Sequence, residues 1–427
     1  MADLGALGAA TALLAAVAGA GMIAAPPAAA HAELDDSDPA AGSRLDQSPA
    51  SVTLTFSEDP DTTLSLVRIV DGAGTAVPGA SDALPVPGAP AQLRVTLGED
   101  LPRGVYTVNW LVVSAEDGHV EDGLFTFGVR ETPLPGSEVE VVLRHTSTWT
   151  SVFGALGRWL LYVGLAGLVG AASTGLFVLG GRLPQGRAKL LYAALLMAVA
   201  GVCTMVATER VLVGVPSLLP LFVTREGQFL LWLGAALVIC AVAVVAFDVW
   251  PGRAALIAIG VTAALAMLAH ARAGHAAATA GLPSLNVVVQ WVHMMAVGVW
   301  VGGLVWLLLG LRGADSPMRA RAARAFSRVA TLALIVVLAS GAARALVELG
   351  APGELISSSY GAGLLVKVGL VVVIVALGAV NHFRLVPALS TGGVTYRPFR
   401  TNARVEVVIA AAVLAATAVL VGLSPPL

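Results

Sequence analysis

The sequence predicts a fold in three parts: a signal peptide, then a small all-β Greek-key sandwich, then an all-α polytopic membrane domain with about eight transmembrane helices. Two observations predict this fold class. The chain of 427 residues is 57% hydrophobic and only 12% charged, which is far from the average of a soluble protein. Its two halves also differ, because residues 31–150 are acidic and rich in Pro and Gly, whereas residues 151–427 are a succession of long apolar runs.

The first thirty residues are expected to be a cleaved signal peptide. An apolar stretch from Leu7 to Ala25 is followed by the small residues Ala28–Ala30, a suitable cleavage site. Asp3 and the lack of Lys or Arg before this stretch are atypical of a signal, so a retained anchor is the alternative. Cleavage would make His31 the first residue, and its free α-amine and imidazole could then chelate a metal together.

Residues 31–131 are expected to form the sandwich, and residues 132–150 a linker that contains two prolines in its first part. Short runs of alternating apolar and polar residues, separated by turn residues, predict a small antiparallel sandwich of the cupredoxin or immunoglobulin type. These runs are Val52–Phe56, Leu64–Val70, Leu93–Leu97 and Tyr106–Trp110. A sandwich of about 100 residues can bury a core on its own.

A candidate metal site in the sandwich combines His31 with the Asp117-Gly118-His119 sequence. Alternation along a strand would put the Asp117 carboxylate and the His119 imidazole on the same face. Nitrogen-rich, tetragonal coordination with an oxygen ligand favours Cu(II). A lone Asp-Gly-His sequence is more often a surface turn, and the site hypothesis therefore depends on His31 at the mature terminus.

Residues 151–427 are expected to form the membrane domain. Eight apolar runs are each near or above the roughly 20 residues that a bilayer requires. They lie at about 151–180, 188–209, 227–249, 254–273, 286–311, 328–347, 361–382 and 404–423. Most basic residues fall in the loops that are cytoplasmic if the sandwich lies outside, so the positive-inside rule puts the sandwich and the C-terminus outside.

The histidines of the membrane domain gather in its predicted outer half. His270 and His275 close the fourth run, and His293 lies in the fifth, about 12 Å below the outer surface. Met267 shares a helix face with His270, and Met294 adjoins His293. Imidazole and thioether ligands together suit Cu(I). His293 is the strongest candidate because a polar group within a span is costly, whereas the methionines are more often packing residues.

Several other residues of the spans are interpreted without a functional role. His382, beside Arg384 at a predicted cytoplasmic end, is interpreted as interfacial. Gly302 and Gly303 are expected to let two helices approach closely. The remaining long basic side chains are expected to snorkel to the surface: Arg158, Arg344 and Lys367.

Five segments of the first domain resemble the periplasmic copper-binding CopC family. They are His31-Ala32, Ser37–Gly42, Val52–Glu58, Gly104–Trp110 and Ser114–Phe125. The resemblance implies Cu(II) held by the N-terminal amine and imidazole, a second histidine and an aspartate, which here are His31, His119 and Asp117. The methionine-rich Cu(I) segment of the family is absent, because no methionine lies between His31 and Thr150. A Cu(II)-only site is therefore expected.

The membrane domain resembles the CopD copper-resistance membrane family, most clearly after residue 265. The segments that carry this resemblance are Gly274–Ala276, Trp291–His293, Trp300–Leu304, Phe326–Ala330, Ser340-Gly341, Ser359–Gly361, Leu364–Lys367 and Asn381–Leu389. The chain thus looks like a CopC–CopD fusion. The resemblance implies copper handling at the membrane, with uptake into the cytoplasm, and it carries onto His275 and His293 as the membrane ligands.

The leading hypothesis is copper import: the sandwich binds Cu(II) outside, and the metal reaches the membrane histidines before it crosses. The expected location is a bacterial inner or plasma membrane, with the sandwich on the extracytoplasmic side. Copper ions and the lipid bilayer are the expected partners, together with an external copper chaperone or reductase. The net charge of −2 argues against a nucleic-acid partner.

Two alternatives stay open. In one, the membrane histidines bind haem and the chain is a membrane oxidoreductase. In the other, the sandwich is an oxidative copper enzyme, because an N-terminal His with a second His is also the copper-binding arrangement of polysaccharide-oxidising enzymes. No phosphate-binding loop or acidic phosphorylation motif is recognisable, so the chain is expected to be a transporter and not an ATPase or other enzyme.

Overall fold

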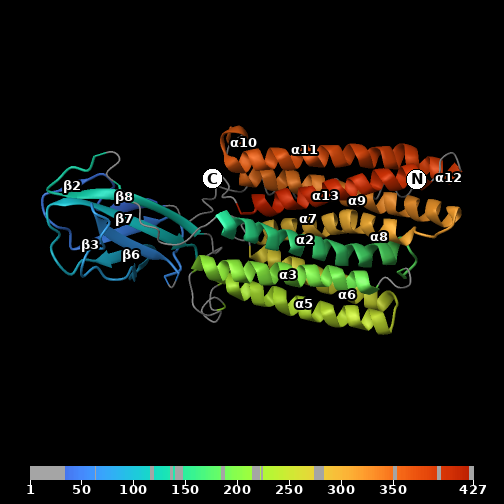
Figure 1. The fold of residues 1–427 in the computed structure, drawn as a ribbon, viewed down its shortest axis with the longest axis horizontal. Helices are drawn as coiled ribbons and strands as arrows, with labels where there is room; N and C mark the ends of the chain where they lie inside the picture. Colours follow the sequence, from blue (N-terminus) through green and yellow to red (C-terminus); the bar gives the residue numbers. More distant parts are fainter. Residues whose placement is uncertain are drawn as a thin grey trace.

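The computed structural model describes residues 34–62, 64–115, 120–134, 138–139, 148–183, 188–213, 222, 225–273, 283–349, 353–391 and 396–422. A β-sandwich is followed along the chain by a bundle of long helices (Figure 1). The sandwich lies beyond the end of the bundle at which helix α2 (Thr148–Phe177) begins. The segment predicted to be a signal peptide lies outside the described residues.

Two four-stranded sheets form the sandwich, which confirms the predicted fold class of this part. One sheet has the order β1 (Leu34–Asp38), β3 (Ser51–Phe56), β6 (Ala89–Thr96) and β5 (Leu84–Val86). The other has the order β2 (Arg44–Leu45), β8 (Val120–Val129), β7 (Gly104–Val113) and β4 (Leu66–Asp71). Neighbouring strands are antiparallel except β2 and β8.

Alternate residues of the strands build the core between the sheets, as the period-two pattern requires. From β3 the inward set is Val52, Leu54 and Phe56, all nearly inaccessible to solvent. The Phe56 ring meets the Trp110 indole of β7 edge to face, with 5.5 Å between ring centroids. Gly123 of β8 makes room for this indole, because a Cβ there would lie only 2.5 Å from a ring carbon.

The first part of the linker is fixed to the sandwich. Thr107 and Asn109 of β7 point away from the core, yet they are only 1% and 2% exposed. Val139 covers them: its amide nitrogen donates to Thr107 Oγ1 at 2.9 Å, and its carbonyl accepts from Asn109 Nδ2 at 3.1 Å. These two hydrogen bonds hold the chain against the outer face of β7 before it continues toward α2.

Eight helical spans are long and apolar enough to cross a membrane in the described part of the chain, as the sequence predicts. Five are built on α2, α3 (Ala188–Val213), α5 (Arg225–Val249), α6 (Arg253–Arg272) and α9 (Ser316–Glu348). One joins α7 (Pro283–Val297), the π-helix η2 (Gly298–Gly302) and α8 (Gly303–Gly310). The last two are α11 (Ser359–Val380) with η3 (Asn381–Leu385) and α12 (Val386–Thr391), and α13 (Tyr396–Leu420). A short helix, α10 (Glu354–Ser357), precedes α11.

Two helices begin earlier than the apolar runs predict. The sixth begins at Ser316 and not near 328, and the eighth begins at Tyr396 and not near 404. Hydropathy marks the part of a helix that suits lipid, whereas the helix itself continues through the basic turns before it. Asp315 fixes the earlier start of α9, because its carboxylate accepts from Met318 N at 2.8 Å as an N-cap.

Helix α2 packs against the π-helix η2 at backbone contact. A Cβ on Gly302 would lie 1.8 Å from the Ala166 carbonyl oxygen, and one on Gly170 would lie 2.1 Å from the Gly302 carbonyl carbon. Nearby, Trp306 Nε1 donates to the Gly167 carbonyl at 2.8 Å. The structure thus confirms the close approach expected at Gly302 and places it between the first and fifth spans.

Candidate functional site

The predicted ligands of the external copper site, His31, Asp117 and His119, lie outside the described residues. Strands β7 and β8 are paired as far as Val113 and Val120. Asp117 and His119 come between these two paired strands in the sequence. The structure describes the scaffold that carries this connection.

A buried carboxylate supports that scaffold. Ser114 Oγ donates to Glu58 Oε2 at 2.6 Å, and the two residues are only 2% and 7% exposed. The next residue, Ala115, donates its amide to the Asp59 carbonyl at 2.8 Å. The segment just before Asp117 is therefore held against the chain that follows β3. Sequence analysis gave Glu58 no role, although it lies in one of the segments that resemble CopC.

His270 lies in the last turn of α6 and faces α2. Its Nε2 is 3.2 Å from the Tyr162 hydroxyl, and the two rings meet edge to face at 5.4 Å. One turn earlier on α2, Arg158 Nε donates to the Ala418 carbonyl of α13 at 2.8 Å. The guanidinium of Arg158, which was expected to snorkel to the surface, instead ties α2 to α13 at the sandwich end of the bundle.

His293 of α7 faces α9, where its Nδ1 lies 2.9 Å from Ser340 Oγ. The Ser340 hydroxyl donates its single hydrogen to the Val336 carbonyl of its own helix. With its hydrogen in that bond, the Ser340 oxygen accepts from His293 Nδ1–H, and this tautomer has the imidazole lone pair on Nε2. A histidine whose other ring nitrogen is fixed in this way is the usual form of a metal ligand. Gly341 keeps room for the ring, since a Cβ there would lie 3.4 Å from His293 Cε1.

Several charged and hydroxyl groups accompany His293 at this end of the bundle. On α9, Arg344 pairs with Glu348 one turn later, and Tyr360 of α11 donates to the same carboxylate. The positive charges of Arg344 and Lys367 act on His293. Arg344 was expected to snorkel, but its side chain is only 21% exposed and is paired within the bundle. Two basic side chains and one carboxylate therefore accompany His293.

The two methionines are packed and do not meet the histidines' ring nitrogens in any described contact. Met267 is 2% exposed in the core between α2, α6 and η2, and Met294 packs beside Trp291 on the same core. His270 and His293 face different helices, and His275 lies outside the described residues. Among the residues that the structure describes, no three His, Cys, Asp or Glu side chains come together as a metal site.

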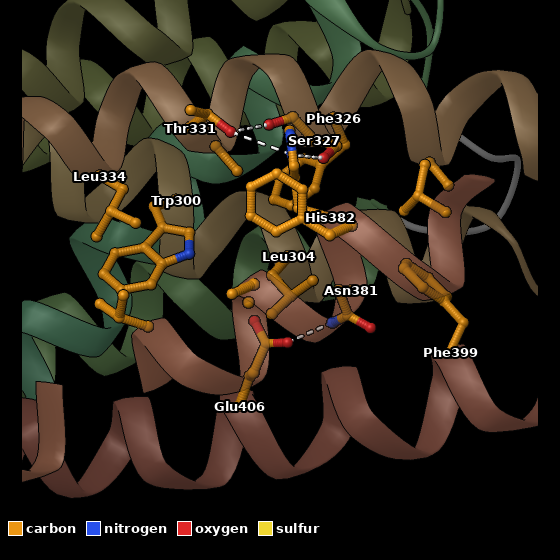
Figure 2. Close-up of a pocket in the computed structure, with 17 residues that line it drawn as sticks. Trp300, Leu304, Phe326, Ser327, Thr331, Leu334, Asn381, His382, Phe399 and Glu406 are labelled. Carbon is orange, nitrogen blue, oxygen red and sulfur yellow. Dashed lines mark hydrogen bonds between the residues drawn. The ribbon is translucent and has the colours of Figure 1, made fainter. Parts of the chain in front are cut away.

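A cavity of about 230 Å³ lies in the other half of the bundle, between α8, α9, η3 and α13 (Figure 2). Aromatic rings such as Trp300 and Phe399 line it, and its polar groups include Ser327, His382 and Glu406. His382 Nδ1 is 2.7 Å from Ser327 Oγ, so this histidine lies within the bundle and not at the interface where sequence analysis placed it. Sequence analysis also assigned no role to Glu406, although it is the one acidic residue in the last apolar run.

The fold and the positions of these residues define a multi-pass membrane protein that carries a β-sandwich domain at one end of its helical bundle. Residues 34–130 match the CopC domain family, and residues 320–420 match the family of Copper resistance protein D, CopD. The chain belongs to the copper-resistance family in which a CopC domain is followed by a CopD domain.

One named relative aligns with nearly the whole chain, and others align with its first domain. Copper transport protein CutJ of Bacillus subtilis (strain 168) is 27% identical over 429 residues, which cover 93% of this chain and 75% of CutJ. Copper resistance protein C of Pseudomonas syringae pv. tomato is 36% identical over 118 residues, covering 26% of this chain and 90% of that protein. The crystal structure of CopC from Methylosinus trichosporium OB3b covers 24% of this chain and 100% of its own, with 29% identity and a TM-score of 0.22. The two curated relatives are named for copper transport and copper resistance, which supports copper handling by this chain.

Proposed function

We propose that this protein binds Cu(II) outside a bacterial cell membrane and imports copper through its helical bundle. One observation carries the proposal: a CopC domain and a CopD domain occur in one chain, which aligns over 93% of its length with a protein named for copper transport. A binding domain fused to a membrane domain keeps captured metal at a high effective concentration beside the bundle.

The capture step rests on the mature N-terminus. The amine and imidazole of His31, with His119 and Asp117, give three nitrogen ligands and one carboxylate oxygen, a set that favours Cu(II). The hydrogen bond from Ser114 to Glu58 supports this assignment, because it fixes the chain three residues before Asp117. The added anionic ligand stabilises the oxidised metal, which suits delivery better than repeated redox turnover.

The entry step rests on the histidines at the sandwich end of the bundle. His293 presents a free Nε2 lone pair, and His275 and His270 lie on or just after the neighbouring helix α6. Met267 and Met294 pack beside these helices and are the weaker candidates for soft sulfur ligands. Passage as Cu(I) requires an electron from outside the chain, so an external reductase or copper chaperone is the proposed partner.

Copper uptake by proteoliposomes that contain the full mature chain tests this function. We expect isotopically labelled copper to accumulate above the level of empty vesicles. His293→Ala should abolish accumulation but keep one Cu(II) bound per chain, whereas His119→Ala should weaken that Cu(II) binding severely. Wild-type vesicles that accumulate no more copper than empty ones would overturn the proposal, and so would unchanged uptake by His293→Ala.

A further inference from the structure

The cavity of Figure 2 contains an acid that the proposed copper path does not use. Glu406 lies ten residues after the start of α13 at Tyr396, which is about 15 Å along the helix. Asn381 lies ten residues before the end of α12 at Thr391, at a similar depth. His293, by contrast, lies ten residues after the start of α7 at Pro283, about 15 Å in from the opposite end of the bundle. The cavity and the histidine site thus occupy different halves of the membrane domain.

Glu406 is buried without a compensating charge in the described structure. Its side chain is 3% exposed. Two amides donate to Oε1: Asn381 Nδ2, and Asn402 Nδ2 at 3.3 Å. None of the ion pairs found among the described residues includes Glu406. An ionised carboxylate inside a membrane span is costly unless a cation joins it, so this geometry calls for one.

The π-helix η3 contributes a buried hydrogen-bond acceptor, Asn381 Oδ1, that has no donor in the described structure. Asn381 is its first residue and is 8% exposed. In Figure 2 its amide nitrogen points toward Glu406, while its Oδ1 is buried and has no hydrogen-bond partner in the described structure. Asn402 also donates to the Leu377 carbonyl at 2.9 Å, next to the point where α11 becomes η3. Single π-turns of this kind are frequent at functional sites.

The side-chain atoms that line the cavity indicate which cation it suits. The lining residues described for the cavity include neither Cys nor Met, so soft Cu(I) would find no sulfur ligand there. Besides Glu406, the one titratable residue described in the lining is His382 on η3. The lining residues from α8, α9, α11, α12 and α13 include no Lys or Arg. Arg404 lies two residues before Glu406 on α13, with its side chain exposed. Glu406 Oε2, to which no donor is described, and the unpartnered Asn381 Oδ1 fit a proton delivered by water.

We propose that Glu406 is a proton-binding site of the membrane domain, reached through this cavity, and that its protonation is coupled to copper transport. Hydronium in the cavity gives its proton to the free carboxylate oxygen, which leaves water and a neutral carboxylic acid; release reverses this step. Ser327 and His382 lie on the α9 and η3 side of the cavity and form the polar part of the route. The coupling rests on the proposed copper transport, whereas proton binding does not.

Infrared difference spectroscopy of the full chain in lipid nanodiscs, titrated between acid and alkaline pH, tests proton binding. We expect a C=O stretching band from a buried protonated carboxyl group. Glu406→Gln should remove this band. Glu348→Gln, the matched change at the other end of the bundle, should keep it. Asn381→Leu should move the band to higher frequency, because the carbonyl loses an N–H donor. A spectrum in which Glu406→Gln removes no titrating band would overturn the proposal.

Copper uptake by proteoliposomes with an imposed pH gradient tests the coupling. Wild-type uptake should change at least about threefold with the gradient, and Glu406→Gln should take up copper at one rate irrespective of it. An equal pH response in both chains would overturn the coupling. If Na⁺ removed the wild-type carboxyl band at constant pH, Glu406 would be a sodium site, and the proposal of a proton site would be overturned. A titrating band without any copper uptake would instead contradict the proposed function alone.

Discussion

Single hydrogen bonds decide the chemistry of the membrane histidines. When the Ser340 hydroxyl donates to its own helix and accepts from His293 Nδ1–H, the tautomer of His293 has its lone pair on Nε2, where a metal can bind. The sequence indicates a costly histidine in a span, but not which ring nitrogen is free. That information depends on a partner 47 residues away on another helix.

Ser340→Ala should therefore lower the rate of copper uptake by about tenfold, because the imidazole loses the partner that fixes its tautomer. The measurement is initial uptake into proteoliposomes at matched protein content. Ser173→Ala is the control: Ser173 is equally buried and donates to its own helix, at Gly170, and no histidine contact is described for it. Equal uptake by the Ser340→Ala chain and wild type would remove Ser340 from the site.

Tyr106 makes the sandwich sensitive to alkaline pH. Burial, with a further contribution from the Asp71 charge, raises the pKa of Tyr106 above its ordinary value of 10.0. The folded state thus holds this proton more tightly than the unfolded chain, so the stabilisation is complete below about pH 10 and is lost as pH rises further.

Urea unfolding of the sandwich domain, which has its own hydrophobic core, should show this loss of stability between about pH 9 and pH 11. Tyr106→Phe removes the hydrogen bond from the hydroxyl to the Pro102 carbonyl and should cost about 1 kcal/mol at neutral pH. The same variant should lose stability less steeply above pH 10. Parallel pH profiles for the variant and the wild type would contradict the role of Tyr106.

At the scale of the elements, hydropathy predicts how many helices cross the membrane but not where each begins or how it is wound. The N-cap of α9 lies in a polar stretch that a search for apolar runs passes over. The two π-helices leave no recognised signal in an apolar sequence, although they place Trp300 and Asn381 at the cavity. For that reason, sequence analysis predicted the eight spans and missed the cavity between them.

The contact between α2 and η2 depends on Gly302. Gly302→Ala should destabilise the bundle by about 1–3 kcal/mol, because the new methyl group would meet a backbone oxygen that cannot move alone. Gly234→Ala on α5 is the matched control, since nothing lies within 4 Å of its added Cβ. Thermal unfolding in detergent should separate the two variants. A Gly302→Ala chain as stable as Gly234→Ala would show that the helices do not touch there.

At the scale of the whole molecule, the chain joins two folds whose sequence signals are independent. Alternation over four short runs predicts the sandwich, and the structure adds β1, β2, β5 and β8, of which β2 and β5 have only two and three residues. The external ligands stay a prediction, because His31, Asp117 and His119 lie outside the described residues. The structure contributes Glu58 and Ser114, a contact across 56 residues that no local pattern reveals.

The central claim is that copper bound by the sandwich crosses through the bundle of the same chain. The most direct test loads the mature full-length protein with one equivalent of isotopically labelled Cu(II), reconstitutes it with the sandwich outside, adds a reductant and measures the label inside the vesicles. We predict that the label moves inside, at no more than one ion per chain, and that His293→Ala leaves it on the sandwich. Label that remains outside in the wild type, or that enters equally well with His293→Ala, would contradict the account.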